Sequence, residues 1–216
     1  MRAVGQLQKK GLGTGVKATI HELAVDFLSP PMDFLGLTTN PAIYVNDETY
    51  HLLGKFHKNW VANHTIAVKE SFLNEHTAQI IGIIVHETGH AFKVAAGIAN
   101  SEANAYIFEI EVLWRWLHQN NTLLYGCTSA DLLEYFNSRL EDYHKSTSGN
   151  PYLSKLVQQI ESGKIPADPE KENLPLLQPS LKRSRSDSST VVPNGKRSSR
   201  STLGLFSESS YVVRIG

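Results

Sequence analysis

The chain has 216 residues, 41% of them hydrophobic, and equal numbers of basic and acidic side chains, so its formal net charge is zero. This length and composition fit one globular domain with added segments. The single cysteine, Cys127, excludes an internal disulfide, and the longest apolar run, residues 78–85, is too short to span a membrane.

The beginning of the chain is predicted to hold a flexible lead-in and then a helix. Residues 1–16 contain four glycines and lack the apolar core of a secretory signal peptide, so we expect a flexible segment and no such signal. Residues 17–28 have apolar side chains at helical spacing and are stopped by Ser29-Pro30-Pro31, which predicts a helix. A short strand is expected at residues 42–45 and a short helix at 48–56.

Residues 65–69 are predicted to form a second strand, directly before the most apolar part of the chain. Two interpretations of this strand stay open. It is either an edge strand that offers its backbone groups to an extended peptide, or an ordinary core strand. The next helix is predicted to begin near His76 or Thr77 and to end before Gly97, a natural C-terminal stop.

Three more helices are predicted further along the chain. Residues 101–119, 129–143 and 152–162 each carry an apolar stripe at helical spacing. Ser101 is a suitable N-cap for the first of them and Ser129 for the second. These stripes are typical of helices that pack on a common core.

The C-terminal part, residues 164–216, is rich in proline and serine and has few large apolar side chains, so we predict a disordered tail. From residue 179 onward there are seven basic and two acidic residues. The part before residue 179 has fourteen basic and nineteen acidic residues. Two basic clusters, residues 182–185 and 196–200, resemble a bipartite nuclear-import signal in their spacing. The alternative is a solvated basic tail.

The helix predicted to begin near residue 76 carries the sequence His86-Glu87-Thr88-Gly89-His90. Residues four apart project from one face of a helix, so His86 and His90 can both offer an imidazole nitrogen to one metal ion. Two imidazoles suit Zn²⁺, and Glu87 is placed to take a proton from zinc-bound water. The alternative is a core helix with satisfied histidines, but burying three such groups unpaired is costly, and a metal removes that cost.

A third protein ligand is expected on the following helix, among Glu102, Glu109 and Glu111. Glu102 and Glu109 share one face of that helix, whereas Glu111 is turned away from Glu102. If the first helix ran six residues past His90 it would descend ~9 Å, and an antiparallel return would bring Glu109 level with the metal. An early end of the first helix, with the small Ala105 below Glu102, would instead favour Glu102.

The motif and the helix after it resemble a known group of enzymes. The stretch His86-Glu87-Thr88-Gly89-His90 matches the HExxH signature of zincin metallopeptidases, and residues 102–106, EANAY, resemble the downstream ligand helix of the gluzincin type. This second stretch is also similar to EANxF in ImmA/IrrE-like peptidases. The resemblance, over residues 65–116, implies one Zn²⁺ held by His86, His90 and Glu102. Glu109 is the alternative ligand, or an acceptor for a ligand histidine.

We therefore expect a helix-rich α+β fold with a small sheet and an active-site helix. A zincin-like metallopeptidase domain would cover residues 17–163, after the lead-in at 1–16 and before the disordered tail at 164–216. The expected function is a zinc-dependent endopeptidase that hydrolyses a protein or peptide substrate by metal-activated water, with Glu87 as general base.

Two alternative functions remain at this point. One is a zinc-binding pseudoenzyme or regulator that uses the same fold to hold partners. The other is an interaction protein whose basic tail binds the nuclear-import machinery or nucleic acid, although we expect neither nucleic acid nor a membrane as the main partner. The expected location is cytoplasmic or nuclear, and the same features would suit a protein that a pathogen delivers into a host cell.

Overall fold

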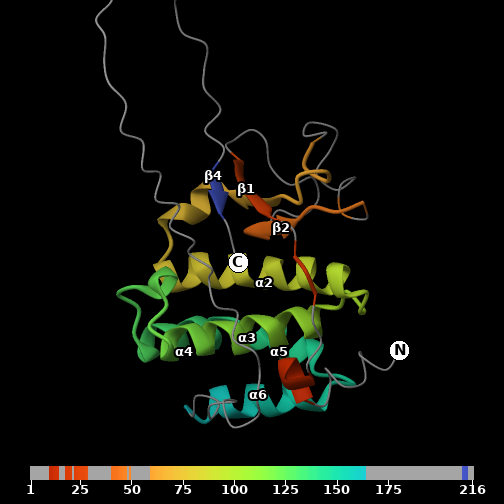
Figure 1. Cartoon of the computed structure of the whole chain (residues 1–216). Coiled ribbons are helices and arrows are strands. Elements are labelled where there is room, and N and C mark those ends of the chain that lie inside the picture. The colour runs from red at the N-terminus through yellow and green to blue at the C-terminus, as the bar shows by residue number, and fades with distance from the viewer. Residues whose placement is uncertain are drawn as a thin grey trace, which may run out of the picture.

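The computed structural model describes residues 10–14, 18–20, 22–28, 40–47, 49, 59–163 and 211–213. Its layers follow one another in Figure 1: a small sheet, then α2 (Thr77–Ala96), then α3 (Glu102–His118) with α4 (Ser129–Ser138) and α5 (Leu140–Ser146), and last α6 (Pro151–Glu161). The architecture is α+β and helix-rich, as the sequence predicts. Within the described ranges, no helix is long and apolar enough to cross a membrane.

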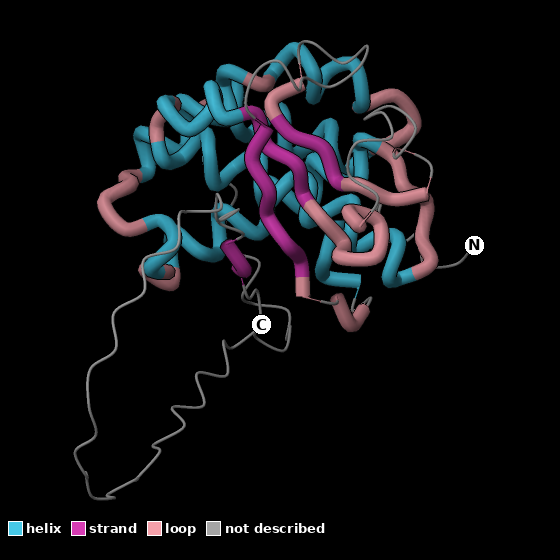
Figure 2. Tube along the Cα trace, turned by 90° about the horizontal axis from the view of Figure 1, so that it is seen from above, coloured by secondary structure: helices cyan, strands magenta, loops and turns pink. Residues whose placement is uncertain are grey.

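The described strands form one sheet: β1 (Leu23–Leu28), β2 (Ala42–Tyr44), β3 (Ile66–Lys69) and β4 (Tyr211–Val213). Their order is β2-β3-β1-β4. β1 and β3 are parallel, with Val25 opposite Ile66, whereas β2 and β4 are antiparallel to their neighbours. Figure 2 shows the strands side by side over the helices. Sheet and α2 share an apolar cluster: Leu23, Val25, Ala42, Tyr44, Ile66, Val68, Ile83 and Ala91.

The helix predicted over residues 17–28 is wrong, because β1 occupies Leu23–Leu28. The apolar residues of this segment satisfy a helical period, but Leu23, Val25 and Phe27 also satisfy the period of two that a strand requires. This segment forms a strand and not a helix because it pairs with β3 on one side and with β4 on the other. Strand formation depends on such distant neighbours more than on local preference.

The strands predicted at residues 42–45 and 65–69 are confirmed as β2 and β3. β3 lies between β2 and β1 and is buried, so it is the ordinary core strand and not the edge strand. The edge beside α2 is formed by β2. The short helix expected at residues 48–56 falls almost entirely outside the described residues.

α2 has the bounds that the sequence predicts. At its start, the His76 side chain accepts from Ala78 N and the Gln79 side chain returns to the backbone of His76. At its end, Gly97 adopts a left-handed conformation with φ of 62°, which glycine tolerates best. Because α2 lies between the sheet and α3, its unusually apolar composition has partners on both sides (Figure 1).

α3 is the second predicted helix, and Ser101 is its N-cap, as expected. It packs closely along α2 where Gly89 faces Phe108. A β-carbon at Gly89 would lie 3.1 Å from Phe108 Cβ, so glycine permits this approach. The main apolar core lies between α2, α3 and the helices below, and Leu113, Phe136 and Leu153 are among its buried members.

The single helix predicted over residues 129–143 is in fact two helices, α4 and α5, with Arg139 between them at φ −106° and ψ 3°. The N-cap is Thr128 and not Ser129. Its hydroxyl accepts from Asp131 N, and the Asp131 carboxylate accepts from Thr128 N. The apolar stripe continues across the break, so hydrophobic periodicity does not reveal it.

The remaining described elements between the terminal segments are the last helix, α6, and two short 3₁₀ turns. α6 confirms the last predicted helix and is capped by Asn150. Two 3₁₀ turns, η3 (Glu70–Asn74) and η4 (Thr122–Leu124), lie in connections between the longer elements.

Both terminal segments contain structure that the sequence does not predict. In the lead-in, η1 (Gly11–Thr14) is a 3₁₀ turn, and Leu12 N donates to Glu111 Oε2 at 2.8 Å. In the predicted disordered tail, Tyr211–Val213 forms β4 against β1. Each of these short segments therefore has a partner elsewhere in the chain. The two basic clusters lie outside the described residues.

Candidate metal centre

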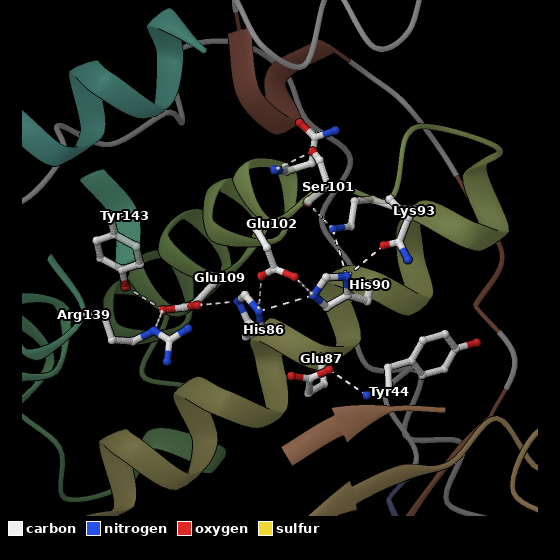
Figure 3. Close-up of polar contacts among 12 residues, drawn as sticks. Tyr44, His86, Glu87, His90, Lys93, Ser101, Glu102, Glu109, Arg139 and Tyr143 are labelled. Atoms are coloured by element: carbon white, nitrogen blue, oxygen red, sulfur yellow. Dashed lines mark hydrogen bonds and ion pairs between the residues drawn. The ribbon is translucent and has the colours of Figure 1, made fainter. Parts of the chain in front are cut away.

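α2 carries the two predicted histidines one turn apart, on the face that meets α3 (Figure 3). His86 is buried, with 5% of its surface exposed, and His90 is partly buried. Their Nε2 atoms lie 3.3 Å apart. Both rings therefore direct the same nitrogen to one point, as a spacing of four on a helix allows.

Glu102, the first residue of α3, reaches both histidines. Its Oε2 lies 3.2 Å from His86 Nε2, and its Oε1 lies 3.4 Å from His90 Nε2. One ligand atom from each of the three residues lies within 4.8 Å of the others. The three residues expected from the sequence thus come together, and the group can hold a metal ion.

The connection between α2 and α3 explains why Glu102, and not Glu109, meets the Nε2 atoms. α2 runs six residues past His90, but the chain then returns along it before α3 begins. Ile98 N donates to Lys93 O at 3.1 Å, and Lys93 Nζ donates to Ser101 O at 2.7 Å. The start of α3 is thereby held one turn from His90. The six residues of α2 past His90 would alone have placed Glu109 level with the histidines. Because the connection runs back along α2, Glu102 takes that level instead.

The other ring nitrogen of each histidine has an oxygen partner. His86 Nδ1 lies 2.8 Å from Glu109 Oε2, and His90 Nδ1 lies 2.8 Å from Asn100 Oδ1. Both oxygens are acceptors, so they favour the tautomer with the hydrogen on Nδ1, in which Nε2 is the nitrogen open to a metal. Glu109 therefore contacts His86, as its second expected role requires.

Glu87 lies on the sheet side of the same helix turn and is buried. Its Oε2 accepts a hydrogen bond from Tyr44 N, at 2.7 Å, across the gap between α2 and β2 (Figure 3). Glu87 does not belong to the converging ligand group, which agrees with a role other than metal ligand. The edge strand thus holds one oxygen of the carboxylate and fixes its direction.

The charges of the cluster favour a cation at its centre. Burial alone would lower the pKa of His86, but hydrogen bonds to Glu102 and Glu109 outweigh burial and raise that pKa to about 9. Burial would raise the pKa of Glu102, but the two histidines outweigh it and hold that pKa far below its usual range. Ionised carboxylates thus draw positive charge to the point where the Nε2 atoms meet.

Lys93 is a buried basic residue beside the site that sequence reasoning misses. Its side chain is fully enclosed, and its Nζ lies 3.3 Å from His90 Nδ1 in addition to the bond to Ser101 O. Burial lowers the pKa of Lys93 to about 7, against the opposing effect of Glu102 and Glu87. The sequence could have pointed to Lys93, because it is a lysine inside the apolar run at residues 91–96. A buried lysine requires a polar partner.

Glu111, the least favoured of the three candidate ligands, is far from the histidines. It is buried on another side of α3, where it accepts from Tyr152 OH and Leu12 N. Burial raises the pKa of Glu111, and these hydrogen bonds and Arg115 oppose the rise. Glu111 therefore anchors the N-terminal turn and α6 and takes no part in the metal centre.

Comparisons of the chain with protein-family models, with curated proteins and with solved structures find no match. The resemblance to gluzincins and to ImmA/IrrE-like peptidases stays a prediction. The candidate metal centre is supported by the positions, burial and charges of its own side chains.

Proposed function

We propose that the chain is a zinc-dependent endopeptidase. The observation that carries the proposal is the convergence of His86 Nε2, His90 Nε2 and a Glu102 oxygen within 4.8 Å, with both Nδ1 atoms engaged by oxygen acceptors. Two imidazoles and one carboxylate form a typical donor set of catalytic zinc, which keeps a further position for water or substrate. Zinc bound there supplies Lewis acidity and an acidified water.

The surroundings of the three ligands support hydrolysis as the reaction. The Glu102 side chain is 57% exposed, so solvent reaches the ligand group from that side. Glu87 is the general base: it takes a proton from the attacking water and passes it to the leaving amine. Tyr44 N–H holds Glu87 Oε2, which leaves Oε1 to accept that proton.

The edge strand β2 supports an extended peptide as the substrate. Among the strands that the structure describes, β2 pairs only with β3, and Tyr44 N–H points to Glu87. An extended chain can add to such an edge through the backbone groups that Glu87 does not occupy. A peptide held along β2 would pass close to Glu87, which is what cleavage within a chain requires.

The test compares wild type with Glu87→Gln, using new peptide N-termini in a protein lysate and cleavage of the peptides so identified. Glu87→Gln keeps the size of the side chain and removes the proton acceptor. We expect zinc content to persist while cleavage falls by at least ~10²-fold, as for loss of a general base. Glu134→Gln, at an exposed position on α4, is the control and should cleave as wild type does.

Two outcomes would contradict the proposal. Cleavage that is unchanged in Glu87→Gln, or unchanged after zinc is removed with a chelator, would exclude the mechanism. Zinc-loaded wild type that creates no new N-termini in any lysate would favour the pseudoenzyme alternative.

A further inference from the structure

Glu109 is fully buried, and its two oxygens have separate partners (Figure 3). Oε2 faces His86 Nδ1 at 2.8 Å. Oε1 accepts from Tyr135 OH at 2.9 Å and from Tyr143 OH at 2.6 Å. One oxygen is therefore anchored to the helices below, and the other is left for the histidine.

Arg139 provides the opposite charge for this buried carboxylate. Its Nε lies 3.2 Å from Glu109 Oε1. The guanidinium also lies over three aromatic rings, at 5.4 Å from the centre of Tyr106, 5.9 Å from that of Tyr135 and 6.0 Å from that of Tyr143. A buried carboxylate without a paired cation is strongly destabilising, whereas a paired and hydrogen-bonded one is tolerated.

The break between α4 and α5 places these groups. Arg139 is the residue at the break, Tyr135 lies one turn before it on α4, and Tyr143 lies one turn after it on α5. All three side chains converge on one oxygen of Glu109. The interruption that hydrophobic periodicity does not reveal is thus the point from which the lower helices reach the metal centre.

We propose that Arg139 is a positioning residue of the metal centre, which acts with Tyr135 and Tyr143 through Glu109 to keep His86 Nε2 directed at the ion. Loss of a partner that orients a ligand histidine typically lowers metal affinity ~10–100-fold. The proposal rests on the metal site of the proposed function and does not require peptide cleavage. A purely structural ion pair would stabilise the fold without any effect on the metal.

Glu111 and Arg115 offer a matched control on the same helix. Glu111 is also buried, and Arg115 NH2 lies 3.7 Å from its Oε2, but this pair does not contact the histidines. Arg115→Met therefore removes an arginine from a buried glutamate of α3 while leaving Glu109 intact. Arg139→Met removes the corresponding partner of Glu109.

The experiment measures zinc affinity by chelator competition and the visible absorption of the Co²⁺ form, which reports ligand geometry. In Arg139→Met we expect zinc affinity to fall by up to the ~10–100-fold typical of losing a direct partner of a ligand histidine, because Arg139 acts through Glu109. The Co²⁺ spectrum should also change. Arg139→Lys, which restores the charge without the planar fork, should recover part of the affinity. Arg115→Met should be less stable to urea but match wild type in both metal readouts.

Tyr143→Phe keeps the test decisive if Arg139→Met fails to fold. It removes one donor to Glu109 Oε1 and should lower zinc affinity in the same direction by a smaller factor. If the folded variants at Arg139 and Tyr143 lose stability but keep wild-type zinc affinity and the wild-type Co²⁺ spectrum, the inference is overturned. Metal binding that depends on Arg139, in a protein that cleaves no peptide, would support the inference and overturn only the proposed hydrolysis.

Discussion

At the scale of single residues, the fold holds the two histidines with unequal strength. His86 Nδ1 contacts the buried carboxylate of Glu109, whereas His90 Nδ1 contacts the amide of Asn100 on an exposed loop. Hydrogen bonds to ionised groups are roughly twice as strong as neutral ones. In the proposed metal site His86 would therefore be the fixed ligand, and the more exposed Glu102 would be the one that adjusts around the ion.

This difference predicts an order of zinc affinities among three variants. Glu102→Gln removes the anionic ligand of the proposed site, so the purified protein should not retain the one zinc per chain that we expect of wild type. Glu109→Gln keeps the shape but weakens the hold on His86, so zinc affinity should fall ~10–100-fold. Glu111→Gln, the control, should bind as wild type does. Zinc per chain and chelator competition measure all three, and wild-type affinity in Glu102→Gln would rule out the ligand set.

The sequence reveals the parts of the site that are local along the chain. His86, Glu87 and His90 follow from helical spacing. The face of the next helix leaves Glu102 and Glu109 as third ligands, and the family resemblance favours Glu102. The groups that orient them are invisible to such reasoning, because they come from other elements. Tyr44 N meets Glu87 from 43 residues away, and Tyr143 meets Glu109 from 34 residues away.

At the scale of elements, the edge strand β2 makes a prediction about the general base. Tyr44→Pro removes the N–H that holds Glu87, at an outward-facing edge position where proline is tolerated. A hydrogen bond to a charged group contributes roughly 1.5–3 kcal/mol, so its loss should lower kcat/KM about 10–100-fold while zinc stays bound.

The control for this prediction is Tyr44→Ala, which loses the same buried ring but keeps the N–H. Only the difference between the two variants reports the hydrogen bond. Equal kcat/KM in Tyr44→Pro and Tyr44→Ala would show that β2 does not position Glu87.

A second prediction concerns the contact between α2 and α4. A β-carbon at Gly82 would lie 2.2 Å from the ring of Tyr135, whereas one at Gly89 would lie 3.1 Å from Phe108. Gly82→Ala should therefore lower the free energy of unfolding by about 1–3 kcal/mol, as overpacking does. Gly89→Ala should cost less, since a shift of a few tenths of an ångström relieves it. Urea unfolding measures the free energy of unfolding of both variants, provided that the dependence on urea concentration keeps the wild-type slope. A larger loss in Gly89→Ala than in Gly82→Ala would contradict the packing described.

The helices were more predictable than the strands for a physical reason. A helix is stopped and started by its own neighbours, as Gly97 ends α2 and Ser101 caps α3. β1 instead needs β3 and β4, which are distant in the sequence. Arg139 is the exception among the helices, because its partner Glu109 lies on another element.

At the scale of the whole molecule, β4 joins a late part of the chain to an early one. Residues 211–213 pair with β1 in antiparallel register, with Val212 opposite Ala24. From the sequence we expect removal of residues 179–216 to leave folding intact. The sheet gives a different expectation, because the deletion would leave the β1 edge unpaired, and unpaired edges promote aggregation.

Two deletions separate the strand from the basic clusters, which the sequence links to nuclear import. Removing residues 201–216 deletes the backbone pairing of β4 with β1. Because a backbone hydrogen bond contributes roughly 0.5–1.5 kcal/mol, the free energy of unfolding should fall by about 1–3 kcal/mol. Removing residues 179–200 deletes both clusters and keeps β4, so stability should stay at the wild-type value while nuclear accumulation in a eukaryotic cell is lost. Zinc affinity should survive both deletions, because His86, His90 and Glu102 lie on α2 and α3.

Urea unfolding and amide exchange in β1 measure the loss of stability on removal of residues 201–216. If the β1 amides exchange equally slowly without these residues, β4 does not protect that edge.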